Sequence, residues 1–210
     1  MKGLLLKDLA IVKQQGRSIF IIVAIAVFMM LSGNDITFAI AYANILFVMF
    51  GITTLNYDAF DNGFSFLFTL PITRKLYEAE KYLFSVMCVA TGLGLSAILM
   101  LVTGNMNSEA LGFIVGYAIA AVLLLSVLLP IELKFGPEKG RIAMIVIFAI
   151  VFAAVFGIKS VVGADKLASI LLNLEKMNDA VVACILAAIV IVLAGISYFI
   201  SCKVIEKKEF

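Results

Sequence analysis

The chain has no histidine and no tryptophan, and it has only three cysteines among its 210 residues. Without histidine, the sequence excludes His-based metal sites, Ser-His and Cys-His catalysis, and histidine proton relays. The cysteines, Cys88, Cys184 and Cys202, are scattered and form no CxxC pair, so they imply no disulfide framework. The composition alone therefore excludes several common kinds of catalytic and metal site.

Charged residues are also scarce. They make up 14% of the chain, whereas hydrophobic residues make up 64% and the mean hydropathy is +1.16. Soluble domains are roughly half apolar, so this excess indicates an all-α, polytopic membrane protein. The first apolar run is short for the roughly 20 residues that a span needs. In all, the apolar runs predict six transmembrane helices, at about 18–33, 36–55, 82–102, 111–129, 142–158 and 180–200.

The positive charges are unevenly distributed over the predicted loops. Only Lys159, Lys166 and Lys176 fall on one side of the spans, and the other lysines and arginines fall on the side of the two termini. Because positive charge collects in the cytoplasm, the sequence predicts cytoplasmic termini and a multi-pass protein of the cytoplasmic membrane. Residues 1–16 are loosely amphipathic and predict an interfacial helix, with a disordered basic N-terminus as the alternative.

No acidic or basic residue lies well inside any predicted span. Ion-coupled transporters usually need such groups near the midplane, so a self-powered transporter is disfavoured. The string that comes nearest to a P-loop, Gly136 to Gly140, lacks the required spacing and the preceding strand. The sequence therefore predicts no enzyme activity, no cofactor in this chain and no nucleic-acid partner. Uphill transport would need energy from another polypeptide.

The longest polar-bearing interruption on the predicted cytoplasmic side runs from Tyr57 to Lys81. Aromatic and polar residues alternate in it at helical spacing, which predicts an amphipathic helix over 57–70. Its aromatic face would meet the membrane interface or the bundle, and its polar face would meet water or a protein partner; the alternative is a helix that only connects two spans. Pro71 predicts a boundary and Thr73 an N-cap for the next helix. The expected aromatic face is Tyr57, Phe60, Phe64, Leu67 and Phe68, and the polar face is Asp58, Asp61, Asn62, Ser65 and Thr69.

Several short motifs are spread over nearly the whole chain: the opening MKGLLLKDL, the loop LPITRK followed by EKY, the loop KFGPEKGR, and the closing KKEF. In their order between six spans they resemble a type-2 ABC transporter permease. The resemblance is to the short six-helix branch that includes peptide and antimicrobial exporters of Gram-positive bacteria, such as those exporting phenol-soluble modulins.

In that family, the segment between spans two and three carries a coupling helix, which seats in a cleft of a separate ATPase subunit. The resemblance places ATPase docking on Asp58, Phe60, Asp61, Asn62, Phe64, Ser65, Phe68, Leu70, Pro71, Arg74 and Lys75. A secondary cytoplasmic contact is placed on Lys134, Gly136, Glu138, Lys139 and Arg141. Residues 1–16 would form the elbow helix and 159–179 an extracytoplasmic helical element. Phe66 stands where such loops often carry tryptophan.

The resemblance implies the transmembrane subunit of an ATP-binding cassette exporter. It would pair with a second copy or a related permease, and a pair of cytoplasmic ATPase subunits would bind ATP-Mg. Amphipathic peptides or hydrophobic compounds are the expected cargo, because the spans offer apolar surface and no charged site. The alternative is a non-transporting membrane immunity or sensor protein that binds a peptide at 159–179.

Overall fold

The computed structural model of the chain describes residues 2–31, 36–60, 63–102, 104, 108–161 and 179–207. Within these residues every regular element is a helix, as the composition predicts. The elements are α1 (Lys2–Gln14), α2 (Gly16–Leu31), α3 (Ile36–Ala59), α4 (Gly63–Leu67), α5 (Arg74–Val102), α6 (Ser108–Val161) and α8 (Asp179–Lys207).

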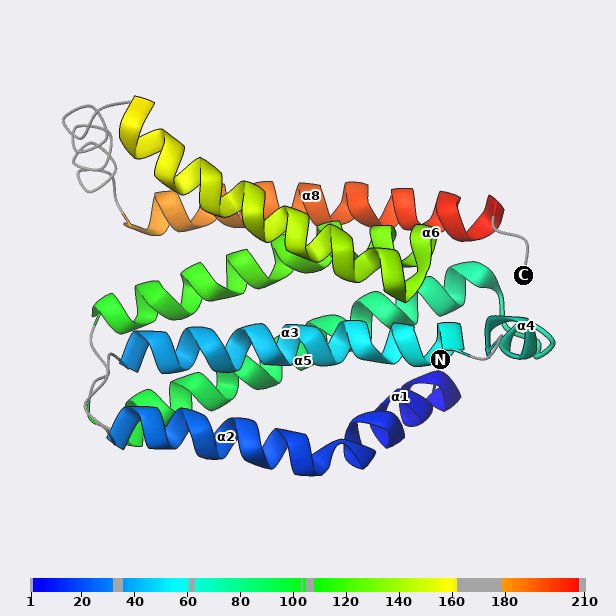
Figure 1. The fold of residues 1–210 in the computed structure, drawn as a ribbon, viewed down its shortest axis with the longest axis horizontal. Helices are drawn as coiled ribbons and strands as arrows, with labels where there is room; N and C mark the ends of the chain where they lie inside the picture. Colours follow the sequence, from blue (N-terminus) through cyan, green and yellow to red (C-terminus); the bar gives the residue numbers. More distant parts are fainter. Residues whose placement is uncertain are drawn as a thin grey trace.

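The long helices lie roughly lengthwise beside one another (Figure 1). The chain reverses direction from α2 to α3, from α3 to α5, from α5 to α6, again at the break within α6, and once more from α6 into α8. Both termini and the short helix α4 consequently lie at the same end of the bundle. Most of the segment 159–179, for which the sequence predicts an extracytoplasmic helical element, lies outside the described residues.

Among the described residues, four helices are long and apolar enough to cross a membrane, so the protein is a multi-pass membrane protein. The α1–α2 pair, bent by 61°, would add a fifth span if it is counted as one. The long helix α6 is counted once although it consists of two arms, which cover the predicted spans 111–129 and 142–158. The four helices pass the test over Ile40–Ala59, Arg74–Val102, Gly112–Ile150 and Ala188–Lys207.

The break in α6 falls at Gly136, where φ is 81° and ψ is 173°. The sequence predicts that Pro130 ends the helix and that a loop follows, and this prediction is wrong, because the helix continues through Pro130. Proline removes one backbone hydrogen bond but is tolerated inside membrane helices. The positive φ needs glycine, and Pro137 then opens the second arm, where its missing N–H costs nothing.

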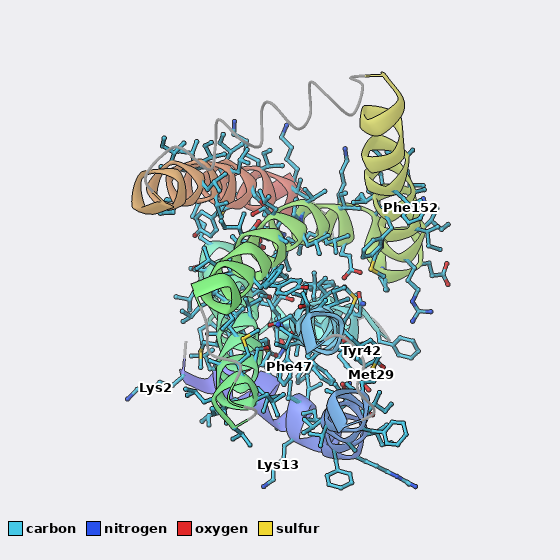
Figure 2. The ribbon with its side chains drawn as sticks, turned by 90° about the vertical axis from the view of Figure 1, so that its left-hand side faces the viewer. Lys2, Lys13, Met29, Tyr42, Phe47 and Phe152 are labelled. Atoms are coloured by element: carbon cyan, nitrogen blue, oxygen red, sulfur yellow. The ribbon has the colours of Figure 1, made fainter. Side chains whose placement is uncertain are left out.

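The helices α3 and α5 approach closely at Gly92. A Cβ added there would lie 3.0 Å from the side chain of Phe47 and 3.1 Å from Oδ1 of Asn44. One turn further on, Asn44 Nδ2 donates to Ser96 Oγ at 2.9 Å. Asn44 is the strongly polar residue within the predicted span 36–55, where such a residue is expected to bond across helices, and this expectation is confirmed. Figure 2 shows Phe47 in the middle of the bundle, whereas Phe152 lies on the outlying second arm of α6.

The main core lies toward the end of the bundle that carries α4. It joins residues from α1, α3, α4, α5, α6 and α8 in one buried cluster, so all these helices support the same end. Its members are Leu4, Val48, Ile52, Leu55, Phe64, Leu67, Tyr77, Val89, Ala121, Leu125, Leu128, Leu129, Leu133 and Ile205.

Candidate coupling site

The segment predicted as one amphipathic helix over 57–70 is divided in the structure. The helix α3 continues to Ala59, and α4 begins at Gly63. The predicted common aromatic face is therefore wrong: Phe64 is buried, whereas Tyr57 and Phe60 are exposed. Helical spacing defines a shared face only along an unbroken helix, and here the chain starts a new helix between these residues.

Aromatic packing holds α4 against the start of α5. The rings of Phe64 and Phe68 stack with their centroids 6.3 Å apart, and each meets the ring of Tyr77 edge-on at 5.8 Å. The guanidinium of Arg74 lies 5.7 Å from the centroid of the Phe68 ring. At the beginning of α5, the backbone N–H of Leu76 donates to Thr73 Oγ1 at 3.3 Å, which confirms the predicted cap. These contacts attach α4 firmly to α5.

Other apolar side chains of this segment face outward. Phe60 is 70% exposed, Phe66 is 72% exposed, and Leu70 and Pro71 are exposed as well. Exposed aromatic rings are typical of protein-binding surfaces. The sequence marks Phe66 only as an aromatic residue in place of tryptophan, and its outward position depends on the anchoring of α4 by its neighbours.

Asp58 was predicted to face a partner, and the structure places it inside, where only 8% of the residue is exposed. Tyr77 OH donates to Asp58 Oδ2 at 3.0 Å, and Lys81 Nζ lies 2.8 Å from the same oxygen. Lys7 pairs with the other oxygen of Asp58. An isolated carboxylate is costly to bury, and these contacts compensate its charge. The prediction that Asp58 faces a partner is therefore wrong.

Lys81 and Asp8 complete a buried group of charges. Lys81 Nζ donates to Asp8 Oδ2 at 2.5 Å and to Thr54 Oγ1 at 3.4 Å, and Lys7 Nζ lies 3.1 Å from Asp8 Oδ1. From the sequence alone, the charge of Lys81 indicates only the cytoplasmic side of the membrane. No local pattern reveals the pair, because 73 residues separate its members along the chain.

Arg74 and Lys75, both predicted docking residues, connect α5 to the end of α8. Arg74 Nη1 donates to the backbone oxygens of Ile205 at 2.9 Å and Glu206 at 2.7 Å, and Lys75 Nζ lies 3.3 Å from Glu206 Oε1. The last carbonyls of a helix lack partners within the helix, so this contact caps α8. Of the remaining predicted docking residues, Ser65 lies in α4, and Asp61 and Asn62 lie outside the described residues.

The predicted secondary contact meets the docking segment around one cavity. The cavity, of about 870 Å³, lies between the end of α3 and the break in α6. Lys134 lies apart from it, in a hollow with Lys203 and Lys207 of α8. The cavity is lined by Met49, Ile52, Thr53, Asn56, Tyr57, Phe60, Glu132, Phe135, Gly136, Pro137, Glu138, Lys139, Arg141 and Met144.

The chain matches the family described as ABC-2 family transporter protein over residues 3–206, which is nearly its whole length. No curated protein and no solved structure matches it. The bundle of long apolar helices agrees with the family match. The chain therefore belongs to the ABC-2 transporter family, as the membrane subunit of an ATP-binding cassette transporter that works with an ATPase subunit.

Proposed function

We propose that this permease exports amphipathic peptides or hydrophobic compounds, and that its ATPase subunit docks on the outward side chains around α4. The docking surface is Phe60, Phe66, Leu70 and Pro71. The observation that carries the proposal is the exposure of Phe60 and Phe66 on a segment in which Phe64 and Phe68 pack on Tyr77. Aromatic residues are enriched where protein surfaces bind one another.

The contacts of α4 explain how docking of the ATPase subunit would move the membrane helices. A displacement of α4 acts on Phe64 and Phe68, and these rings press on Tyr77 in the second turn of α5. Because packed side chains resist compression, the displacement passes to α5, which is one of the long apolar helices. The cavity beside Phe60 and Arg141 gives the ATPase subunit a second place to contact the permease.

The orientation follows from the basic residues. Lys2, Lys13, Lys75 and Lys139 are exposed and belong to the segments that the positive-inside rule assigns to the cytoplasm. Both termini lie at the end that carries α4 (Figure 1). In our proposal this end is cytoplasmic, where ATP is available to the partner subunit.

The cargo and the assembly are inferred from the membrane-facing surface. The second arm of α6 presents Ile145, Phe148 and Phe152 as exposed apolar side chains. Such a surface suits lipid, a second permease or an apolar cargo. Export, and a seam between paired permeases that opens alternately, rest on the resemblance to the six-helix exporters.

The docking surface is tested by truncating one exposed ring. Phe66→Ala is expected to reduce co-purification of the ATPase subunit in mild detergent and to lower ATP hydrolysis by the complex in proteoliposomes. Phe20→Ala on α2 is the matched control, because Phe20 is 75% exposed and Phe66 is 72% exposed. A Phe66→Ala permease that retains its ATPase as well as the control does would overturn the assignment.

A further inference from the structure

Lys81 holds a central position among the buried charges. It is 1% exposed and contacts Asp8 of α1 at 2.5 Å and Asp58 of α3 at 2.8 Å. Lys7 contacts the same two carboxylates, so the charges alternate around a closed ring. This charge ring, Lys7, Asp8, Asp58 and Lys81, joins three helices that lie far apart in the sequence.

The charge ring lies directly beside the docking segment. Asp58 lies in the last turn of α3, and its carboxylate accepts a hydrogen bond from the hydroxyl of Tyr77. The ring of that tyrosine also packs on Phe64 and Phe68, and Lys81 Nζ lies 5.4 Å from its centroid. Tyr77 thus connects the charges to the aromatic contacts that hold α4.

A buried ring of charges contributes more to fixing the relative positions of the helices than to their stability. Replacing buried ion pairs with apolar residues is often neutral for stability, whereas removing one partner is costly. Charge-assisted contacts do fix distance and direction more closely than apolar contacts. On α1, Asp8 is buried and contacts Lys81, and Leu4 is buried in the main core, whereas Leu6 and Leu9 are exposed.

We infer that Lys81 is a positioning residue for energy coupling. Through the charge ring it makes α1 and the end of α3 follow α5 when the ATPase subunit displaces α4. This inference rests on the proposed docking at α4. It adds a role for α1, which contributes no residue to the docking surface, packs in the main core through Leu4 and is joined to α3 and α5 by the charge ring.

The test removes one charge of each sign and then follows helix movement. Asp58→Asn combined with Lys81→Met leaves Lys7 paired with Asp8 on α1, so each remaining charge of the ring keeps a partner. The matched control, Lys75→Met with Glu206→Gln, removes an exposed ion pair that also involves α5. Each permease is purified with its ATPase subunit, and the native cysteines are replaced.

Spin labels report the movement without any need to know the cargo. One label replaces Lys2 on α1, whose side chain points outward in Figure 2, and another replaces Thr69 beside α4. A label at Val192 on α8 is the common reference. In the permease with the unaltered charge ring and in the control, trapping with ATP and vanadate is expected to change the distance from each of the two labels to the label at Val192.

In the Asp58→Asn/Lys81→Met variant the shift at Lys2 is expected to be lost while the shift at Thr69 remains. An undiminished shift at Lys2 would overturn the inference, as would a Lys2 label that never moves in the unaltered ring. If trapping leaves the Thr69 label in place, the proposed docking at α4 fails instead. Should the variant not insert, Lys7→Met with Asp8→Asn frees α1 from the ring and keeps Lys81 paired with Asp58, with the same outcomes expected.

Discussion

The sharpest prediction for stability concerns Lys81→Met alone. The substitution leaves Asp8 and Asp58, both buried, with Lys7 as the only cation of the charge ring. Breaking a buried ion pair from one side costs about 3–5 kcal/mol, because the remaining charge is left uncompensated. For a chain of this length, about 1 kcal/mol shifts Tm by about 2–4 °C, so Lys81→Met should lower Tm by about 6–20 °C.

The assay is thermal denaturation in detergent, followed by the loss of the monodisperse peak in size-exclusion chromatography. Lys75→Met is the control, because Lys75 pairs with Glu206 at the surface and its side chain is 72% exposed. Exposed ion pairs contribute about 0–1 kcal/mol, so the control should lower Tm by at most about 4 °C.

The prediction extends to the double variant. Asp58→Asn combined with Lys81→Met should cost less than the sum of the two single substitutions, by about 0.5–3 kcal/mol, because the two side chains contact each other. Equal losses for Lys81→Met and Lys75→Met, or strictly additive single effects, would refute the charge ring as a buried, coupled unit.

Two further predictions concern the glycines that shape the bundle. Gly92→Leu should destabilise the protein by about 1–3 kcal/mol in the same denaturation assay, because the leucine side chain would enter space held by Phe47 and Asn44. Gly94→Leu is the control, because a Cβ added at Gly94 has nothing within 4 Å, and equal effects of the two substitutions would contradict the close approach of α3 and α5. Gly136→Ala should cost about 1–2 kcal/mol, because φ is +81° at this position, and unchanged stability would contradict the break in α6.

The features that were predictable from the sequence depend on composition and on neighbouring residues. The apolar runs predict the long helices, and Thr73 caps α5 through a bond to a residue three positions away. Asn44 is the strongly polar residue within its apolar run, so an interhelical bond was its expected role, and it donates to Ser96. In each case the chemistry of one residue and its place within an apolar run were sufficient.

The position of Asp58 could not be predicted in the same way. Its partners Lys7 and Tyr77 are 51 and 19 residues away, and Asp8 and Lys81 are 73 residues apart. The helical pattern placed Asp58 on a polar face and Phe64 on an aromatic face because it assumed an unbroken helix. In the structure α3 ends at Ala59 and a new helix begins at Gly63, so the residues before and after the break do not share the predicted faces.

The break in α6 was misplaced for a related reason. Proline is the stronger signal in a sequence, and Pro130 was expected to end the helix. The packing of Leu128, Leu129 and Leu133 in the main core instead carries the helix beyond it. The chain then turns at Gly136, where a positive φ is accessible without strain.

The charge ring also imposes an order on biogenesis. Lys7 and Asp8 leave the ribosome well before Lys81, and the carboxylate of Asp8 has no counter-charge across the ring until α5 is in place. Membrane segments are made from the N-terminus onward, so α1 must wait in water or at the lipid interface while α2 and α3 insert. The first helix of the chain would thus be among the last to reach its final position, and the end that carries α4 would be completed only when it does.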